Sequence, residues 1–330
     1  MSGVSEGAMP GTCDATDGVS PMIVGLWILA LPTIIWLLAY SLPQLYMTFR
    51  PVPDLKKRYN AKWALVTGGG SGIGKSLAFK LASQGLNVVV VSIEDDCLKA
   101  TMKELKEHYP KLEFRSVGCI FSPGTDYMET IVKATADIDI PIIFNNAGFI
   151  VTGFIDSSPI GKLLANIECN TTACVNISHH FVNKMVKSKT KGCIVYTSSV
   201  AGFIPTPFAA MYASTKAFVS QLACCLHIEV HNLGIDVCAV HPSPVASNFY
   251  DKVDHKIEMM EAAQKSAVPP DALPNCIFRS IGVCALRDIG GMAVATRMGV
   301  FFLPYNFFTK IFTMAAPYLP DYKNHNKSRQ

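Results

Sequence analysis

A tyrosine and a lysine four residues apart carry the clearest chemistry in this sequence. Tyr212 and Lys216 lie in a stretch expected to be helical over 209–232, so their spacing places them on one face. A phenol with an ordinary pKa of about 10 exchanges protons poorly at neutral pH, but a neighbouring ammonium favours the phenolate. Ser199, thirteen residues earlier, can hold a carbonyl or alcohol oxygen beside the phenol. The three side chains predict a proton-transfer site.

A glycine-rich turn lies far upstream of these residues. Residues 67–74 read TGGGSGIG and connect an expected strand, 63–67, to an expected helix, 73–84. Glycines permit a tight turn there and let the backbone approach a pyrophosphate at the positive end of the helix. Because the turn has the strand-to-helix context that such loops require, it predicts a dinucleotide site.

The elements that must position these motifs alternate along the chain. Strands are expected at 63–67, 87–92, 113–118, 140–144, 193–198 and 235–240, and helices near 73–84, 95–108, 125–136, 158–187 and 209–232. Continuous apolar strands separated by helices are typical of a parallel sheet covered on both faces. We therefore predict an α/β fold with a doubly wound parallel sheet of the Rossmann type, forming a single catalytic domain.

The motif order resembles that of the short-chain dehydrogenase/reductase family, over residues 63–250. The matching motifs are TGxxxGxG from Thr67 to Gly74, NNAG at 145–148, Ser199 in YTSSVAG, YxxxK at 212–216, and PSPV from Pro242, where the family usually has PGxV. Five motifs in the family's order make the resemblance specific.

The resemblance implies roles for individual residues. Ser199, Tyr212, Lys216 and Asn170 would be catalytic, with Lys216 also binding the nicotinamide ribose and Asn170 supporting a proton-relay water. Cofactor contacts are expected from Gly68, Ser71, Gly72, Ile73, Gly74, Ser92, Asn146, Ala147, Gly148, Tyr212, Lys216, Pro242, Val245 and Ser247. The expected cofactor is NADP, with NAD as an alternative, and it supplies the hydride. No histidine or cysteine spacing suits a metal; His241 is a further candidate to approach the nicotinamide.

Two positions depart from the family pattern. The second strand ends at Ser92-Ile93, where membrane-anchored relatives often carry arginine, and an inward-pointing Glu94 or Asp95 would repel a 2′-phosphate. Ile120 stands where the family usually has an aspartate that binds the adenine amino group. These changes leave the choice between NADP and NAD open. They also motivate a rival hypothesis, a non-catalytic membrane scaffold that keeps the fold.

The N-terminal part predicts a membrane anchor. Residues 22–42 are uncharged and apolar, long enough to cross about 30 Å of hydrocarbon, and lie between a polar tail at 1–21 and a basic linker at 43–60. A cleaved signal peptide would need a basic start and a small-residue cleavage site, which are not evident. Since basic residues follow the stretch and none precedes it, we expect a single-pass protein with its catalytic domain facing the cytosol.

The composition sets limits on the remaining segments and partners. Half of the 330 residues are hydrophobic and 16% are charged, and this composition excludes a disordered chain. The net charge is +4 and there is no long basic run, so we expect no nucleic-acid binding. The eleven cysteines are expected to be buried free thiols in a reducing compartment.

The C-terminal segment 253–330 follows a core at 61–252. We expect this segment to cover the substrate and, through its apolar stretch 298–320, to contact the membrane.

An anchor together with an apolar C-terminal segment indicates a lipid-like substrate. The layout looks like that of endoplasmic-reticulum 3-oxoacyl-CoA reductases and related 17β-hydroxysteroid dehydrogenases, with 3-ketodihydrosphingosine reductases as close rivals. We expect a ketone and a hydroxyl to be interconverted on a 3-oxoacyl-CoA or 3-ketosphinganine, with Tyr212 as the acid/base. A steroid or retinoid dehydrogenase is the alternative. The resemblance further implies the endoplasmic reticulum as location and a homodimer.

Overall fold

The computed structural model describes residues 21–250 and 257–326, so most of the predicted tail and the start of the segment 253–330 lie outside the described residues. The chain divides into two units, at Leu45 and Tyr46. The described part of the first belongs to one helix, α1 (Pro21–Phe49). Its portion Val24–Phe49 is long and apolar enough to cross a membrane, which makes it a candidate membrane span that continues beyond the predicted end at residue 42.

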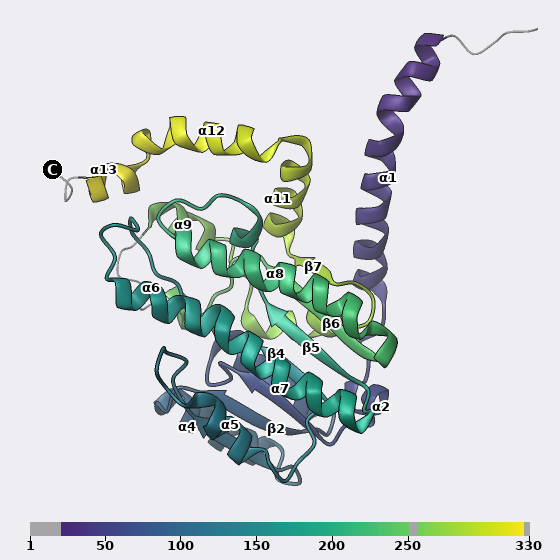
Figure 1. The fold of residues 1–330 in the computed structure, drawn as a ribbon, viewed down its shortest axis with the longest axis vertical. Helices are drawn as coiled ribbons and strands as arrows, with labels where there is room; N and C mark the ends of the chain where they lie inside the picture. The colour runs from purple at the N-terminus through teal and green to yellow at the C-terminus, as the bar shows by residue number, and fades with distance from the viewer. Residues whose placement is uncertain (1–20, 251–256, 327–330) are drawn as a thin grey trace, which may run out of the picture. The chain divides into compact units, whose positions relative to one another are not determined.

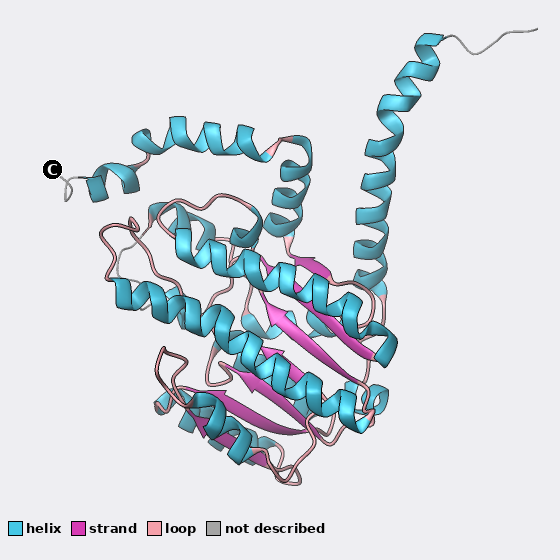
Figure 2. Ribbon diagram, viewed as in Figure 1, coloured by secondary structure: helices cyan, strands magenta, loops and turns pink. Residues whose placement is uncertain are grey.

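The second unit is built on a parallel sheet with the strand order β3-β2-β1-β4-β5-β6-β7 (Figures 1 and 2). The strands are β1 (Trp63–Thr67), β2 (Asn87–Ser92), β3 (Phe114–Gly118), β4 (Ile142–Asn145), β5 (Gly192–Thr197), β6 (Ile235–Pro242) and β7 (Leu286–Ile289). Because the order reverses between β1 and β4, a crevice for a ligand is expected at their carboxyl ends. The predicted doubly wound α/β fold is confirmed, and β7 extends it by a strand that was not predicted.

Helices cover both faces of this sheet. The helices of the second unit are α2 (Leu55–Tyr59), α3 (Gly72–Ser83), α4 (Asp96–His108), α5 (Tyr127–Ala134), α6 (Ile160–Ile167), α7 (Ala173–Ser188), α8 (Ala210–Val230), α9 (Glu258–Gln264), α10 (Leu273–Ser280), α11 (Gly291–Phe302), α12 (Tyr305–Ala315) and α13 (Pro320–Asn326). One apolar cluster joins α3, α4 and α10 to the sheet, and another joins α5, α7 and α8 to it. The alternation of strand and helix thus buries each apolar strand between two layers.

Two local expectations were wrong. The single helix expected over 158–187 is divided into α6 and α7 by a π-helical turn, Glu168–Thr172. The cysteines are not uniformly buried: of the ten described, Cys174, Cys193 and Cys238 are buried, whereas Cys97 and Cys225 are exposed. These two cysteines lie on the solvent-facing sides of helices α4 and α8, so their thiols are accessible and not part of the core.

The basic segment before β1 packs onto the sheet. Leu55 is fully buried and Tyr59 is 5% exposed. The Tyr59 hydroxyl donates to Asp236 Oδ2 at 2.6 Å, and Arg58 Nη2 donates to the same oxygen at 2.8 Å. Two donors on one carboxylate at the start of β6 therefore fix α2 to the sheet.

We expect Tyr59→Phe to lower the free energy of unfolding by about 1–2 kcal/mol, because the buried Asp236 carboxylate loses one of its donors. Denaturant unfolding of the detergent-solubilised chain measures the change. The matched control is Tyr109→Phe, at a tyrosine following α4, which should shift stability by less than about 0.5 kcal/mol. Equal effects of the two substitutions would contradict the role given to Asp236.

Candidate active site

The glycine turn lies where the strand order reverses. Gly68 adopts a positive φ of 64° and its N–H donates to Val91 O of β2 at 2.7 Å. A Cβ at Gly74 would lie 2.1 Å from Gly68 O, so the first turn of α3 packs directly on the backbone of the loop. No larger residue fits at position 74 without moving that backbone.

The N-terminus of α3 has the features of a pyrophosphate site. Its N-cap, Ser71, makes no side-chain capping hydrogen bond, and the first turn carries no acid. Backbone N–H groups of that turn therefore have no cap from Ser71 and are suited to bind an anion. A Cβ at Gly72 would lie 3.2 Å from Ser247 Cβ, which places Ser247 next to the loop.

Thr67 joins the glycine turn to the NNAG segment. Its Oγ1 accepts hydrogen bonds from the backbone N–H groups of Asn146 and Ala147, both at 2.9 Å. The Asn146 amide donates to Thr67 O at 3.1 Å and accepts from Thr197 Oγ1 at 3.0 Å. The carboxyl ends of β1, β4 and β5 are thus connected through one asparagine and one threonine.

Ser199, Tyr212 and Lys216 meet at this edge of the sheet. The Ser199 hydroxyl hydrogen-bonds the Tyr212 phenol, which lowers the phenol pKa, but burial has the larger effect and raises it well above 10. Lys216 Nζ lies 5.5 Å from the centre of the Tyr212 ring and donates to Thr197 O at 2.8 Å. The ammonium is buried, and burial lowers its pKa. The predicted proton-transfer side chains are therefore brought together.

Asn170 joins this group through the π-helical turn. Its Oδ1 accepts from Phe149 N at 3.1 Å, while its Nδ2 donates to Phe149 O and Thr215 Oγ1, both at 3.0 Å. A Cβ at Gly148 would lie 3.0 Å from Asn170 Oδ1 and 3.2 Å from Lys216 Nζ. The glycine at 148 lets the amide and the ammonium approach the same backbone segment.

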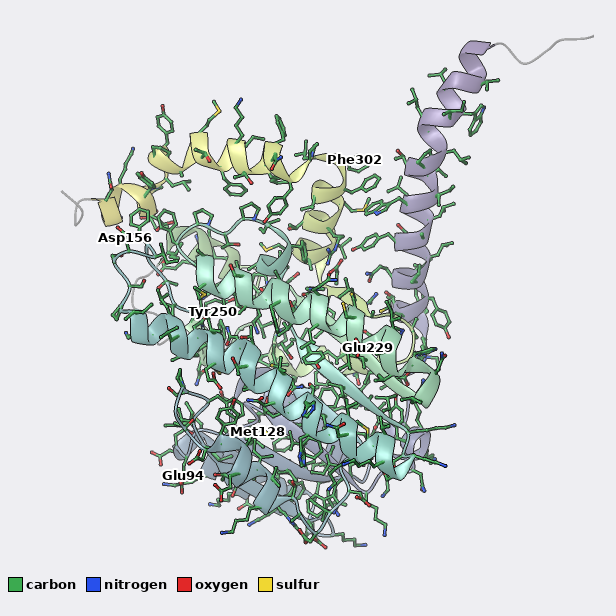
Figure 3. All side chains as sticks on the ribbon, viewed as in Figure 1. Glu94, Met128, Asp156, Glu229, Tyr250 and Phe302 are labelled. Atoms are coloured by element: carbon green, nitrogen blue, oxygen red, sulfur yellow. The ribbon has the colours of Figure 1, made fainter. Side chains whose placement is uncertain are left out.

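The acids after β2 do not converge on the loop. Asp95 caps α4 by accepting from Leu98 N at 2.9 Å. Glu94 lies over the end of β3, since a Cβ at Gly118 would be 3.1 Å from Glu94 Oε2; Figure 3 labels this residue. Ser92 Oγ would be 3.0 Å from a Cβ at Gly70, so Ser92 does border the loop. Ile120, at the predicted adenine position, is 56% exposed.

His241 is part of a buried hydrogen-bond network behind helix α8. Its Nε2 lies 2.9 Å from Ser220 Oγ, and its Nδ1 lies 3.1 Å from Asp288 Oδ1. Asp288 in turn accepts two hydrogen bonds from Arg297 of α11, at 2.9 and 3.0 Å. Since Ser220 Oγ also donates to Lys216 O at 2.8 Å, this network connects α11 to the backbone of helix α8.

Aromatic side chains that sequence reasoning missed lie beside the phenol and in a second cluster made by Phe154, Phe208 and Tyr322. The Phe249 ring lies 5.8 Å from that of Tyr212, and Tyr250 follows it (Figure 3). Phe208 has a positive φ of 65°, rare for a large side chain, and packs on Phe154 at 5.2 Å. Tyr322 of α13 packs on Phe154 edge to face at 5.4 Å. Because these rings come from four distant segments, no local pattern could have indicated them.

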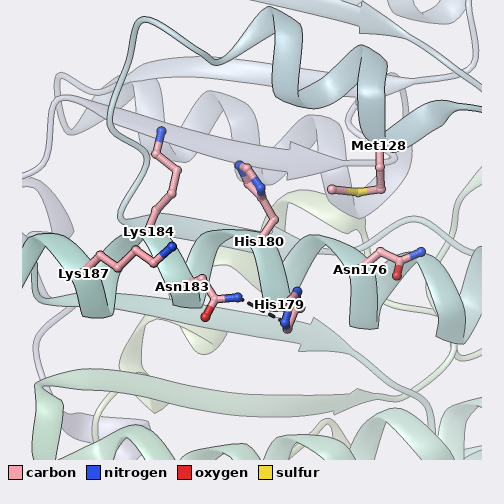
Figure 4. A pocket seen from close by; sticks show the side chains of 7 residues that line it. All are labelled: Met128, Asn176, His179, His180, Asn183, Lys184 and Lys187. Atoms are coloured by element: carbon pink, nitrogen blue, oxygen red, sulfur yellow. Dashed lines mark hydrogen bonds between the residues drawn. The ribbon is translucent and has the colours of Figure 1, made fainter.

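The remaining features lie apart from this cluster. Pro242 ends β6 and Val245 is buried beyond it, near the start of the C-terminal segment. A pocket on the outer face of α7 (Figure 4) includes none of the predicted site residues; it is lined by Met128, Asn176, His179, His180, Asn183, Lys184 and Lys187. Within residues 21–250 and 257–326, no group of three or more histidines, cysteines or acids could hold a metal.

Comparison with known proteins gives the same result as the motifs. Residues 62–258 match the short chain dehydrogenase family. The chain belongs to this family. The resemblance stated from the motifs is confirmed, and with it the class of NAD(P)-dependent dehydrogenases and reductases.

Several relatives indicate where in the family the chain lies. It is 33% identical to "Putative steroid dehydrogenase 3" of Caenorhabditis elegans, over 63% of this chain and 67% of the relative. It is 32% identical to the very-long-chain 3-oxoacyl-CoA reductase of Bos taurus, over 67% of this chain and 69% of the relative. The chain thus spans about two thirds of the length of such relatives.

A solved structure supports the fold independently. A short-chain dehydrogenase from Sphingobium yanoikuyae in complex with NADPH has a TM-score of 0.62 and 25% identity, over 73% of this chain and 95% of that chain. A 7β-hydroxysteroid dehydrogenase shares the fold, with a TM-score of 0.67 at 24% identity, over 76% of this chain and 95% of that one.

We expect Thr67→Val to lower the free energy of unfolding by about 1–3 kcal/mol, because two backbone N–H groups lose their acceptor while the side-chain shape is kept. Chemical unfolding measures the loss. Thr67→Ser retains the hydroxyl and should recover most of it. If the serine variant is as unstable as the valine variant, the methyl group and not the hydrogen bonds holds the NNAG segment.

Asp288→Asn should show a pH-dependent loss of stability. Burial alone would raise the pKa of Asp288, but hydrogen bonds and charges from His241 and Arg297 hold the pKa at about 2, below its ordinary 3.8. The carboxylate therefore contributes about 2 kcal/mol above its unfolded pKa, and this is lost as pH falls toward the folded pKa. The stability difference between parent and variant should be constant near neutral pH and shrink from about pH 4 toward about pH 2. A difference that persists unchanged at the acid end would contradict this assignment.

Proposed function

We propose that this chain is a membrane-bound, NADP-dependent reductase that converts the ketone of a 3-oxoacyl-CoA into a hydroxyl. The observation that carries the proposal is the convergence of Ser199, Tyr212, Lys216 and Asn170 at the carboxyl edge of the sheet, beside the glycine turn. The very-long-chain 3-oxoacyl-CoA reductases among its relatives support the substrate class. NAD is the second candidate cofactor, because no arginine or lysine follows Ser92 directly.

The residues present fit a dinucleotide. Gly68 and Gly74 let the turn pack closely on the NNAG segment and on α3, and Ser71 makes no side-chain cap, so backbone N–H groups at the N-terminus of α3 are suited to a pyrophosphate. Lys216 Nζ donates to Thr197 O, and its other N–H donors suit ribose hydroxyls. When bound, the nicotinamide supplies the hydride to the carbonyl carbon.

The side chains of this site supply the proton. Ser199 donates a hydrogen bond to the substrate oxygen and orients it toward Tyr212. The phenol then transfers its proton to that oxygen as the carbonyl becomes a hydroxyl, and the Lys216 ammonium stabilises the phenolate left behind. Asn170 holds the Phe149 backbone at both its N–H and its carbonyl, so it supports the turn that borders Lys216. Re-protonation of Tyr212 from water completes the cycle.

The buried phenol of Tyr212 is suited to donate a proton. Burial raises the pKa of Tyr212, so the phenol holds its proton at neutral pH and is ready to donate it. A neutral, reduced nicotinamide leaves that preference unchanged, whereas a positively charged, oxidised one would favour the phenolate.

A steroid or retinoid dehydrogenase is the second candidate. The steroid dehydrogenases named among the relatives favour it, and an aromatic surround of Phe154, Phe208 and Phe249 suits a flat apolar substrate as well as an acyl chain. An endoplasmic-reticulum location with the catalytic unit in the cytosol is part of the proposal. The orientation rests on the candidate span Val24–Phe49 and the basic residues that follow it. The organelle rests on the resemblance to endoplasmic-reticulum 3-oxoacyl-CoA reductases alone.

The test is NADPH oxidation by the detergent-solubilised full chain with 3-oxoacyl-CoA, 3-ketosphinganine and ketosteroid substrates. Tyr212→Phe should lower kcat by roughly 10²–10⁴ while the Kd for NADPH stays within about threefold, because the phenol transfers the proton but does not hold the pyrophosphate. Tyr109→Phe, remote from the site, should leave both values unchanged. NADPH binding without turnover of any of these substrates would favour the non-catalytic scaffold, and loss of binding in Tyr212→Phe would contradict its assigned role.

A further inference from the structure

Helix α12 presents apolar side chains to solvent along one face. Phe307, Ile311 and Met314 are 49%, 43% and 67% exposed, and Tyr318 in the following turn is 78% exposed. Steps of four, three and four residues place all of them on one side of a helix. None of the residues of α12 is buried. We call these side chains the α12 stripe.

The stripe is held in place and is not a frayed end. Helix α12 lies between α11 and α13 (Figure 1), and both of these helices contact the rest of the second unit. On one side, Arg297 of α11 forms two hydrogen bonds with the buried Asp288 of β7. On the other, Asp321 of α13 accepts a hydrogen bond from the first N–H of α9 at 2.9 Å, and Tyr322 packs on aromatic rings near the site. The fold therefore presents the stripe at a fixed place.

The segment of chain that carries the stripe has charge of one sign. Between Asp288 and Asp321 the sequence contains no acid and only two bases, Arg297 and Lys310. Arg297 is already paired with Asp288, whereas Lys310 lies on α12, next to Ile311 in sequence. A lysine at the border of an apolar helix face can bury its methylenes and keep its ammonium in the headgroup layer.

We propose that the α12 stripe is seated in the interfacial layer of a phospholipid bilayer, with Lys310 at the level of anionic headgroups. Exposed apolar surface that the fold holds in place marks an interaction site. A bilayer is the occupant that this chain itself brings within reach, since Val24–Phe49 is long and apolar enough to cross one. A second copy of the chain is a less suitable occupant of the stripe. A stable protein–protein interface uses about 20–30 residues from each partner, whereas the stripe offers one row of side chains. The proposal does not depend on the reaction catalysed.

The test places a fluorescent reporter in the stripe of the full chain. Trp27→Phe and Trp36→Phe first remove the indoles of α1, which leaves Trp63, only 5% exposed in β1. Phe307→Trp then reports on the stripe in vesicles of phosphatidylcholine and phosphatidylserine with ordinary or brominated acyl chains. We expect bromination to reduce the added emission by roughly half, because an interfacial helix buries its apolar face about 5–10 Å into the headgroup and acyl boundary.

The control is Ile228→Trp, at an isoleucine of α8 that is 77% exposed but lies outside the stripe. Its emission should be insensitive to bromination. If the Phe307→Trp emission is quenched no more than that of the control, the proposal is wrong. An emission that instead shifts with the protein-to-lipid ratio, without bromine quenching, would show that a second copy covers the stripe. Met314→Trp is the replacement reporter should Phe307→Trp fail to fold, as judged by circular dichroism.

Discussion

The Lys216 ammonium is 4% exposed, and the structure around it is arranged to make that burial tolerable. A buried charge costs several kcal/mol unless nearby groups take the place of water. The Thr197 carbonyl supplies one acceptor, at 2.8 Å. The backbone at Gly148 can approach the ammonium only because residue 148 lacks a side chain. The backbone carbonyl of Lys216 in turn accepts hydrogen bonds from the hydroxyls of Ser198 and Ser220. The site therefore depends on backbone groups gathered from β4, β5 and α8.

The need to pair buried polar groups explains why some helices and strands could be predicted from the sequence and others could not. Strands β1 and β2 have the bounds that their apolar runs indicated, since a strand buried on both faces must be apolar throughout. Strand β7 carries Arg287 and Asp288 within four residues, and the Asp288 carboxylate is acceptable in the interior because His241 and Arg297 pair with it. The π-helical turn depends on contacts between Asn170 and Phe149, and helical periodicity carries no information about those.

The candidate site likewise contains residues whose placement follows from local sequence and residues whose placement depends on tertiary contacts. The spacing of Ser199, Tyr212 and Lys216 reflects local geometry, the end of one strand and a single helix face, so the sequence was sufficient to bring them together. The aromatic surround has no such local origin. Phe154, Phe208 and Tyr322 meet only because α13 returns to the loop after β4, and the left-handed backbone of Phe208 is held by tertiary contacts such as the hydrogen bond from Gly153 N to Phe208 O at 2.7 Å. The part of the molecule that would select a substrate is thus the part that the sequence describes least.

Two positions depart from the family pattern, and they bear on whether the chain catalyses. Ile93 and Ile120 follow β2 and β3, where the resemblance places contacts to the ribose and the adenine, so each would remove one contact to a dinucleotide, on the order of 1 kcal/mol or about fivefold in Kd. In contrast, Lys216 lies in the interior, where an apolar residue of similar size would stabilise a protein that had no use for the charge. A scaffold that needed only the fold would gain stability by losing this ammonium. Its presence, with a buried phenol and a serine beside it, is better explained by proton transfer than by structure alone.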